Sequence, residues 1–485
     1  MSTLRDIPGL LVAATLLGAA LVAPATTHAQ ASAADVSPED AVAALRQRIE
    51  AKDYEQAVTE ARRLVDLALQ RPEAGEDLQV AYMNLAVAQY LAGDYVGAEA
   101  SYLKVIELVE ASGRLTNPRL ARAQAGLATT YYAGKRYDLA VAHFDRAVAL
   151  SRRSEGLFNE AQLPLLEKYA DSLTEVGRTE DALKVQRYAL RVVERKHGAK
   201  SVPYASQLEA IGRWYAQVRA YEASRATIRG AIGILEDLKG DDAVELIGPL
   251  TALADCNRRQ LLDPRDEELT SADDQRRAMF HDPMAPVGPA LASNSIASEG
   301  QKALERAVAI ASSRPETAPA QVADVRTQLG DWYQARQQFD KALPAYQQAW
   351  QAAVGQTLDG KPLTERLFGR PVLLYYVPPD AWDRNARRSA DEIAVQTVAV
   401  ELTVTSQGRV SAAQVVADGG DPKFAAQTAK AVQAARYRPR FEQGQPVETT
   451  GVRLEQPFWI VVEKKPETPE VQAPEADQAP PPAGT

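Results

Sequence analysis

The stretch AGLATTYYAGKRYDLAVAHFDRAV, residues Ala125 to Val148, returns along the chain with the same arrangement of small and aromatic residues. The small residue Ala128 precedes the aromatic Tyr137, which opens a second apolar segment, and the small residue Ala140 follows three positions later. Helices that cross closely need small residues at the crossing, because larger side chains would hold their backbones apart. The corresponding positions of the neighbouring copies are spaced by 42 residues: Ala86, Ala170 and Gly212; Tyr95, Thr179 and Tyr221; Ala98, Ala182 and Ser224. A constant period of this length predicts stacked pairs of helices.

Less regular copies flank these four, at Asp40–Val65 and at Val325–Trp350. The pattern of small and aromatic residues resembles the tetratricopeptide repeat, with a long period similar to that of kinesin light chains. The resemblance implies a mainly α-helical protein, in which an α–α solenoid of about seven helical hairpins spans residues 39–354.

One copy, the sixth, is interrupted. Its first helix is predicted to end at Leu262 and its second to begin at Ala297. The residues between them, about 263–297, hold four prolines and many charges and have no periodicity. We therefore predict a disordered insertion; a loop with a docking role is the alternative.

A different periodicity begins near Gln396. Apolar residues alternate with polar ones from Val398 to Val404, which predicts a strand, and Gly408 marks a turn into a second strand. Asp421 and Pro422 are typical of a helix start. Two further segments, YRPRF and VRLEQPFWIVV, are read as strands, so residues 395–463 are predicted to form a small α+β domain of order β-β-α-β-β.

This order is similar to the C-terminal domain of the TonB family. The matching residues are Gly408 and Val410 in the first turn, the helix from Pro422, Tyr437-Arg438-Pro439, Gly444-Gln445-Pro446-Val447, and Pro457-Phe458. We expect Tyr437–Phe441 to lie beside the last strand, Val452–Val462.

The three arginines of this stretch, Arg436, Arg438 and Arg440, are expected to point to solvent, and a basic binding face is the alternative. Residues 355–394 are interpreted as a connecting segment. The tail, 464–485, has six prolines and is predicted to be disordered.

The N-terminus has the features of a secretory signal. A short basic start is followed by the apolar run Ile7–Ala23 and a small-x-small site at Thr27-His28-Ala29. We expect residues 1–29 to be a cleaved signal peptide and the protein to reach the periplasm. An uncleaved segment would instead hold the protein in the inner membrane.

Several function classes are disfavoured. The net charge of −9 argues against nucleic-acid binding, which needs a clustered basic surface. The chain has no HExxH, CxxC, GxSxG or glycine-rich phosphate loop, and its one cysteine, Cys256, is predicted to be buried. We therefore expect a protein that is not an enzyme, with no cofactor, no metal and no small-molecule substrate.

Candidate binding residues follow from the resemblances. Tetratricopeptide arrays bind partners along a concave face lined by the first helix of each pair, and TonB-like domains offer a free strand edge. A carboxylate clamp is rejected, because only Asn84 fits it. The residues predicted to contact partner peptides are Tyr90, Tyr132, Glu167, Asp171, Glu209, Arg213, Gln217, Asp331 and Gln334 in the array, and Arg453 and Leu454 in the last strand.

These features together predict a periplasmic scaffold or adaptor that binds other envelope proteins or peptides. The alternative is a TonB-type energy transducer, held in the inner membrane by an uncleaved anchor and serving transport through outer-membrane receptors. A further alternative is that these residues only form solvated helix faces and bind no ligand.

Overall fold

The computed structural model describes residues 38–70, 75–113, 117–263, 289–314, 317–379, 393–418 and 421–461. The chain divides into two compact units. One unit runs to Leu261 and adds Ser293–Ala303, and the rest of the chain forms the other. The predicted signal peptide, the predicted tail and residues 264–288 of the predicted insertion lie outside the described residues.

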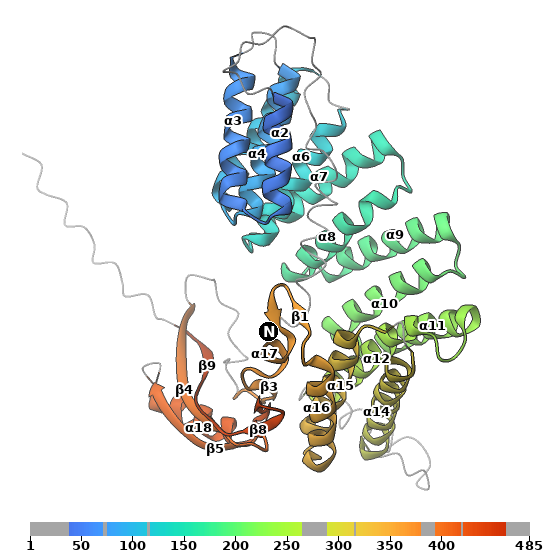
Figure 1. Cartoon of the computed structure of the whole chain (residues 1–485), viewed down its shortest axis with the longest axis vertical. Helices are drawn as coiled ribbons and strands as arrows, with labels where there is room; N and C mark the ends of the chain where they lie inside the picture. Colours follow the sequence, from blue (N-terminus) through green and yellow to red (C-terminus); the bar gives the residue numbers. More distant parts are fainter. Residues whose placement is uncertain are drawn as a thin grey trace, which may run out of the picture. The chain divides into compact units, whose positions relative to one another are not determined.

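The first unit is built from helices that follow one another as antiparallel pairs, as Figure 1 shows for α2 to α11. Short 3-10 turns, η1 (Glu160–Gln162) and η2 (Val244–Leu246), precede two of the helices. The helices are α2 (Pro38–Glu50), α3 (Tyr54–Leu69), α4 (Gly75–Leu91), α5 (Tyr95–Ala111), α6 (Pro118–Ala133), α7 (Tyr137–Glu155), α8 (Leu163–Glu175), α9 (Thr179–His197), α10 (Val202–Gln217), α11 (Tyr221–Lys239) and α12 (Ile247–Leu261). Helix α14 (Pro289–Ser313) contributes only Ser293–Ala303 to this unit.

The small residues predicted at the helix crossings are buried there. Ala86, Ala128 and Ala170 have 0% exposure. At Gly212 an added Cβ would lie only 2.4 Å from Cγ1 of Ile228 on the paired helix, so no larger residue fits without movement. The predicted crossings are confirmed, and close approach of the backbones explains the requirement for small side chains.

The turn inside each pair repeats with the same backbone conformation. The residues predicted to open the second helices are the first residues of α5, α7, α9 and α11. Two positions earlier φ is positive: +79° at Gly93, +58° at Lys135 and +64° at Arg219. A left-handed residue after a helix end turns the chain back on itself, so one short turn places each second helix against its partner.

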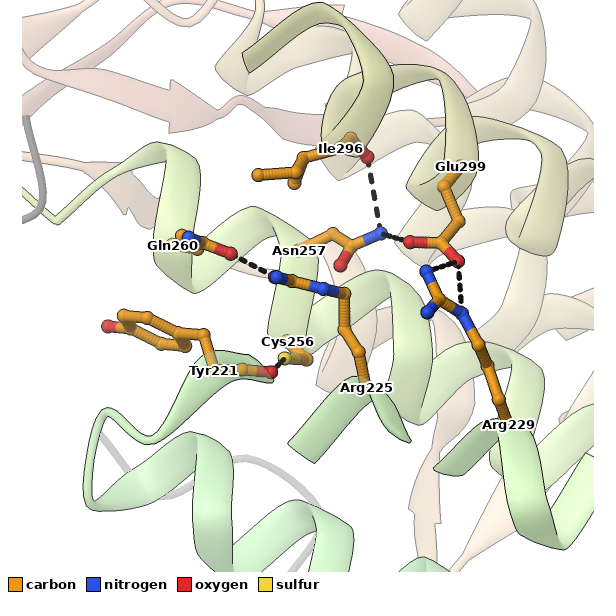
Figure 2. Close-up of polar contacts among 8 residues, drawn as sticks. All are labelled: Tyr221, Arg225, Arg229, Cys256, Asn257, Gln260, Ile296 and Glu299. Carbon is orange, nitrogen blue, oxygen red and sulfur yellow. Dashed lines mark hydrogen bonds and ion pairs between the residues drawn. The ribbon is translucent and has the colours of Figure 1, made fainter. Parts of the chain in front are cut away.

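The sixth pair forms although its two helices are separated by the insertion. Figure 2 shows Asn257 of α12 donating to Oε2 of Glu299 on α14 at 3.0 Å. Arg229 of α11 forms an ion pair with the other oxygen of Glu299 at 2.6 Å. Cys256 is fully buried, as predicted, and its thiol donates to the carbonyl of Tyr221 at 3.5 Å. Burial raises the pKa of this thiol, which makes it unreactive.

The second helix of this pair starts earlier than predicted. Helix α14 begins at Pro289, not at Ala297, so residues 289–296 are helical rather than part of a loop. Proline at the first helical position has a fixed φ suited to a helix start, and alanine and leucine follow it. The sequence analysis counted Pro289 among the prolines that indicate a loop, whereas Pro289 is the first residue of the helix.

The second unit contains the last helical pair and the strand-rich C-terminal region. Its elements after α14 are α15 (Pro319–Ala335), α16 (Phe339–Ala353), β1 (Thr357–Leu358), β2 (Lys361–Pro362), α17 (Leu363–Phe368), β3 (Val372–Tyr375), β4 (Ile393–Val404), β5 (Val410–Ala417), α18 (Pro422–Gln433), β6 (Arg436–Arg438), β7 (Arg440–Glu442), β8 (Gln445–Val447) and β9 (Thr449–Val461).

The main sheet has the order β5-β4-β9, with both neighbours antiparallel to β4 (Figure 1). Val398, Val400, Leu402 and Val404, the alternating residues of β4, are buried in the core of this region. Helix α18 begins after Asp421, which caps it by accepting from the backbone N–H of Lys423. The first two strands, the helix and the last strand were predicted correctly.

Helix α18 covers the sheet, with its apolar residues in the shared core. The ring of Phe424 stacks on Phe458 of β9, with centroids 4.2 Å apart. Val432 is fully buried in the same cluster. Because Phe424 and Val432 are eight residues apart, they lie on one helix face.

The segment Tyr437–Phe441 does not lie beside the last strand, so this prediction is wrong. Pro439 divides the segment into β6 and β7. Strand β6 pairs with β3, and β7 pairs with β8 in a hairpin that turns at Gly444. Proline cannot donate to a strand ladder, which is why the ladder stops there. The turn residue Gly444 is half-buried, because it lies over the ring of Trp350.

Residues 355–394 are more than a connection. They contain the β1–β2 hairpin, α17 and β3, and β3 supplies the partner of β6. Among the described residues no helix is both long enough and apolar enough to span a membrane.

Candidate partner-binding surfaces

The first helix of each pair presents a stripe of side chains, which we call the first-helix face. On each first helix, this face consists of the residues one and four positions after the small crossing residue, together with the residues one helical turn before or after them. On α4 and α6 the later position is a tyrosine. Tyr90 packs against Tyr95 with ring centroids 5.9 Å apart, and Tyr132 packs against Tyr137 at 5.8 Å. Two aromatic pairs therefore recur one repeat apart, with Tyr90 and Tyr132 half-buried and Tyr95 exposed.

The face becomes charged on α8. The hydroxyl of Tyr132 donates to Oδ2 of Asp171 at 3.4 Å, which links α6 to α8. Nζ of Lys168 lies 4.9 Å from the centroid of the Tyr132 ring. Burial lowers the pKa of Lys168, while the nearby carboxylates of Glu167 and Asp171 oppose this shift. Glu167 and Glu175 are exposed one turn before and one turn after Asp171. This part of the face carries more negative than positive charge.

On α10 the charged residues pair with each other. Arg213 donates to Oε1 of Glu209 at 2.8 Å and to the carbonyl of Gly248 at 3.1 Å. Gln217, one turn further along, is half-buried. The guanidinium is therefore held against the next first helix, α12.

On α15 the same face is occupied by the C-terminal region of the chain. Nε2 of Gln334 donates to the carbonyl of Gln407 at 2.7 Å and to that of Tyr437 at 3.0 Å. Gln334 is 2% exposed. Nε of Arg438 lies 3.1 Å from Oδ1 of Asp331 in an ion pair. Asp331 and Gln334 thus bind strand β6 and the β4–β5 turn, and this contact removes both from the surface predicted for outside partners.

Arg438 does not point to solvent, and that expectation is wrong. Its side chain is 9% exposed, its Nη1 donates to the carbonyl of Leu367 at 2.9 Å, and its guanidinium faces the ring of Phe368. The hydroxyl of Tyr346 also donates to Asp331, at 2.9 Å. A buried arginine needs such a set of acceptors, because an unpaired buried charge is costly. Arg436 and Arg440 are half-buried, and Arg440 pairs with Glu442.

An aromatic cluster completes this contact. The ring of Phe441 lies 4.9 Å from that of Phe368 and 5.8 Å from that of Tyr346, and it stacks on Trp350 at 6.2 Å. Trp350 and Phe441 also line an open surface pocket beside α17 and the β7–β8 turn, whose rim carries Glu365 and Gln445.

The last strand forms an edge of the main sheet. Among the described residues β9 pairs with β4 alone, so one row of its backbone groups faces away from the sheet. Arg453 is exposed and forms an ion pair with Glu455 at 3.0 Å. Leu454 is 7% exposed and lies in the core. Of the two predicted contact residues, only Arg453 has a side chain that a partner can reach.

The part of the chain that the structure describes holds no group of three or more histidine, cysteine, aspartate or glutamate residues placed to bind a metal ion. Of the residues that the sequence pattern assigned to the first helices, Tyr90 lies on α4, Tyr132 on α6, and Glu167 and Asp171 on α8. The sequence analysis did not predict strand β3 or the ion pair between Arg438 and Asp331. The apolar run VLLY at Val372–Tyr375 could have indicated β3.

Two family models match the chain. Residues 77–153 match the tetratricopeptide repeat, and residues 389–455 match the Gram-negative bacterial TonB protein C-terminal. Both resemblances drawn from the sequence are confirmed. No curated protein sequence shows significant similarity to this chain.

Solved structures with a similar helical-repeat fold share little sequence with it. A putative kinesin light chain from Podosopora anserina with nearly identical TPR-like repeats is 14% identical, with a TM-score of 0.38 over 41% of this chain and 94% of its own. BtubC (BKLC) from P. vanneervenii is 18% identical, with a TM-score of 0.33 over 66% and 95%. The apo form of the quorum sensor NprR from B. thuringiensis is 14% identical, with a TM-score of 0.33 over 64% and 87%.

Proposed function

We propose that this chain, which joins tetratricopeptide repeats to a TonB-type C-terminal domain, is a non-enzymatic scaffold of the Gram-negative cell envelope. In this role it works in the periplasm after removal of residues 1–29. It holds other envelope proteins through extended segments, which bind to the first-helix face or add to the free edge of β9.

The observation that supports this proposal most directly is the contact on α15. There the first-helix face holds an extended segment of the same chain, with Gln334 donating to its backbone carbonyl and Asp331 pairing with its arginine. Backbone recognition gives affinity and side-chain pairing gives specificity, which is how extended peptides are generally bound. The faces of α4, α6 and α8 present aromatic and charged side chains in the same register.

The free edge of β9 supports a second binding mode. Its unpaired N–H and C=O groups can extend the sheet with an incoming strand, and Arg453 flanks that edge. Because Leu454 lies in the core, the test has to use Arg453.

A photo-cross-linking amino acid placed at Glu167, at Arg453 or at the exposed Asp66 of α3 tests the proposal in intact cells. Periplasmic proteins captured at Glu167 or Arg453 but not at Asp66 are expected. Equal capture at all three positions, or capture at none, contradicts the scaffold role. Capture at one of the two surfaces alone assigns the binding to that surface.

The energy-transducer alternative is supported by the match to the TonB C-terminal model over residues 389–455. It requires the N-terminal apolar run to remain attached as an anchor. Sequencing the N-terminus of the mature protein separates the two proposals: a start near Gln30 or Ser32 supports the periplasmic scaffold, and an intact start supports the transducer.

A further inference from the structure

The loop between α7 and α8 holds two large apolar side chains at the surface. Leu157 is 57% exposed and its neighbour Phe158 is 45% exposed. The hydroxyl of Tyr188 on α9 donates to the carbonyl of Leu157, and Nε2 of Gln162 donates to the carbonyl of Gly156 at 3.0 Å. These bonds fix the backbone of the loop against α9, so the two apolar side chains are exposed at a fixed position.

Helix α9 presents a row of arginines beside this loop. Arg187, Arg191 and Arg195 follow one another at intervals of four residues, and all three are exposed. Residues four apart lie on the same face of a helix. The guanidinium of Arg195 lies 5.9 Å from the centroid of the Phe158 ring, which joins the row to the loop. We call the three arginines together with Leu157 and Phe158 the α9 patch.

Neighbouring carboxylates do not neutralise the arginines of the α9 patch. Within the described part of the chain none of the three forms an ion pair. The nearby Lys196, by contrast, pairs with Glu160 at 2.5 Å, and His197 contacts the same carboxylate. Residues 182–200 contain six lysines and arginines and one glutamate, in a chain with a net charge of −9. The patch is therefore locally basic, against the overall charge of the chain, and it attracts anions.

We propose that the α9 patch binds the surface of a bilayer that contains anionic phospholipid. Such a surface offers both components that the patch needs. Its phosphate groups suit the three arginines, because a guanidinium donates two N–H groups to one phosphate. Its hydrocarbon boundary takes up exposed apolar side chains such as Leu157 and Phe158. An acidic protein segment matches the arginines but offers no apolar partner to the loop. The proposal goes beyond the scaffold function, which does not require contact with lipid.

A fluorescent label can report this contact from the loop itself. Ala161→Cys introduces an exposed thiol three residues after Phe158, and a dye that brightens in apolar surroundings is attached there in the full chain. Cys256 is buried with a raised pKa and stays unlabelled. The emission is expected to rise with vesicles of equal parts phosphatidylglycerol and phosphatidylcholine, and not with phosphatidylcholine alone. The dye lies beside the α9 patch, so it reports on this loop even if the N-terminal apolar run enters the vesicles.

The charge of the patch is tested by combining Arg191→Gln with Arg195→Gln. This double variant is expected to bind the anionic vesicles about thirtyfold more weakly, because each arginine near such a surface contributes about fivefold. The matched control combines Arg62→Gln with Arg63→Gln, which removes the same charge from exposed positions of α3. The control is expected to bind as the wild type does.

The apolar component is tested by Phe158→Ser. Losing the burial of one aromatic side chain in the bilayer boundary is expected to weaken binding about tenfold. Leu69→Ser is the control, because Leu69 is 59% exposed at the end of α3, and it should bind the vesicles unchanged. Thermal unfolding followed by circular dichroism establishes that each variant folds.

The proposal is overturned if the dye responds to neither kind of vesicle or equally to both. It is also overturned if the double variant on α9 and its control on α3 bind the anionic vesicles alike. A rise in emission with soluble polyglutamate, without one for the anionic vesicles, would assign the patch to an acidic protein segment instead.

Discussion

The first-helix faces of α8 and α15 present an aspartate in the same register, yet their surroundings differ. Asp331 on α15 is covered by β6 and bound to Arg438, whereas Asp171 on α8 lies between two exposed glutamates. One helix pair has become part of the core of the second unit, whereas Asp171 of the other accepts the hydroxyl of Tyr132 from a neighbouring first helix. The comparison teaches that position within a repeat determines where a side chain projects, and that the next segment of chain determines whether it is available.

The largest effect is expected when the ion pair between Arg438 and Asp331 on α15 is removed. Arg438→Met leaves the carboxylate of Asp331 without its ion-pair partner in a largely buried place, so unfolding of the second unit should become easier by about 3–5 kcal/mol. Urea unfolding with hydrogen exchange resolved by segment measures it, and protection should fall in α15 and β6 but not in α6 and α7.

Arg440→Met is the matched control, because Arg440 lies two residues away and its ion pair with Glu442 is more exposed. Its effect is expected to stay below about 1 kcal/mol. Equal effects of the two substitutions would mean that the Arg438–Asp331 pair does not hold the last helix pair to the strands.

A smaller effect is expected where a helix crossing of the first unit is overfilled. Ala128→Leu places three extra carbons at a site with 0% exposure, which should destabilise the first unit by about 1–3 kcal/mol. Ala142→Leu, on the exposed side of α7, should change stability little. An unchanged melting temperature for Ala128→Leu would contradict the repeat register.

The smallest expected effect concerns Asp324, about two helical turns before Asp331 on α15. Burial is the main cause that raises the pKa of Asp324, Asp331 adds to the rise, and Arg438, Arg366 and the hydrogen bond from Gln328 oppose it. The folded protein therefore favours the protonated form. Its contribution to stability is present below the ordinary aspartate pKa and is lost as pH rises through the raised value.

Asp324→Asn should remove this loss, so the variant should be more stable than the wild type above that pH window and should depend less on pH within it. Stability measured from pH 3 to pH 8 checks the slope, with Asp66→Asn as the control. A steeper slope in Asp324→Asn than in the wild type would reverse the sign assigned here.

The sequence predicted the repeat array well because its information is local and periodic. The crossing residues recur at one spacing, and each second helix begins where the opening residue predicts. The same periodicity assigned Tyr132 and Asp171 to first helices, and they lie on α6 and α8. Helix α14 was predicted to start too late because a proline at a helix start was read as part of a loop.

The C-terminal region was predicted less well because its pairings join distant segments. Strand β6 pairs with β3, which lies more than 60 residues earlier in a stretch with no periodic pattern. Nothing local to Arg438 shows that Asp331 is its partner, so solvent exposure was expected. Local sequence determines the direction in which a side chain projects from its helix or strand. Which segment of the chain then packs over that side chain is determined by the assembled fold.

The contact of α15 with β6 also limits how such a chain can be divided and recombined. A cut between α16 and β4 passes through a boundary that the two family matches suggest, yet it would expose the aromatic rings of Tyr346 and Phe441 and separate Arg438 from Asp331. A TonB-type domain excised there would carry an uncompensated arginine and an apolar patch prone to aggregation. A fragment that keeps these contacts has to begin before α15. Fusing this domain to another protein therefore requires that the helical hairpin of α15 and α16 be included.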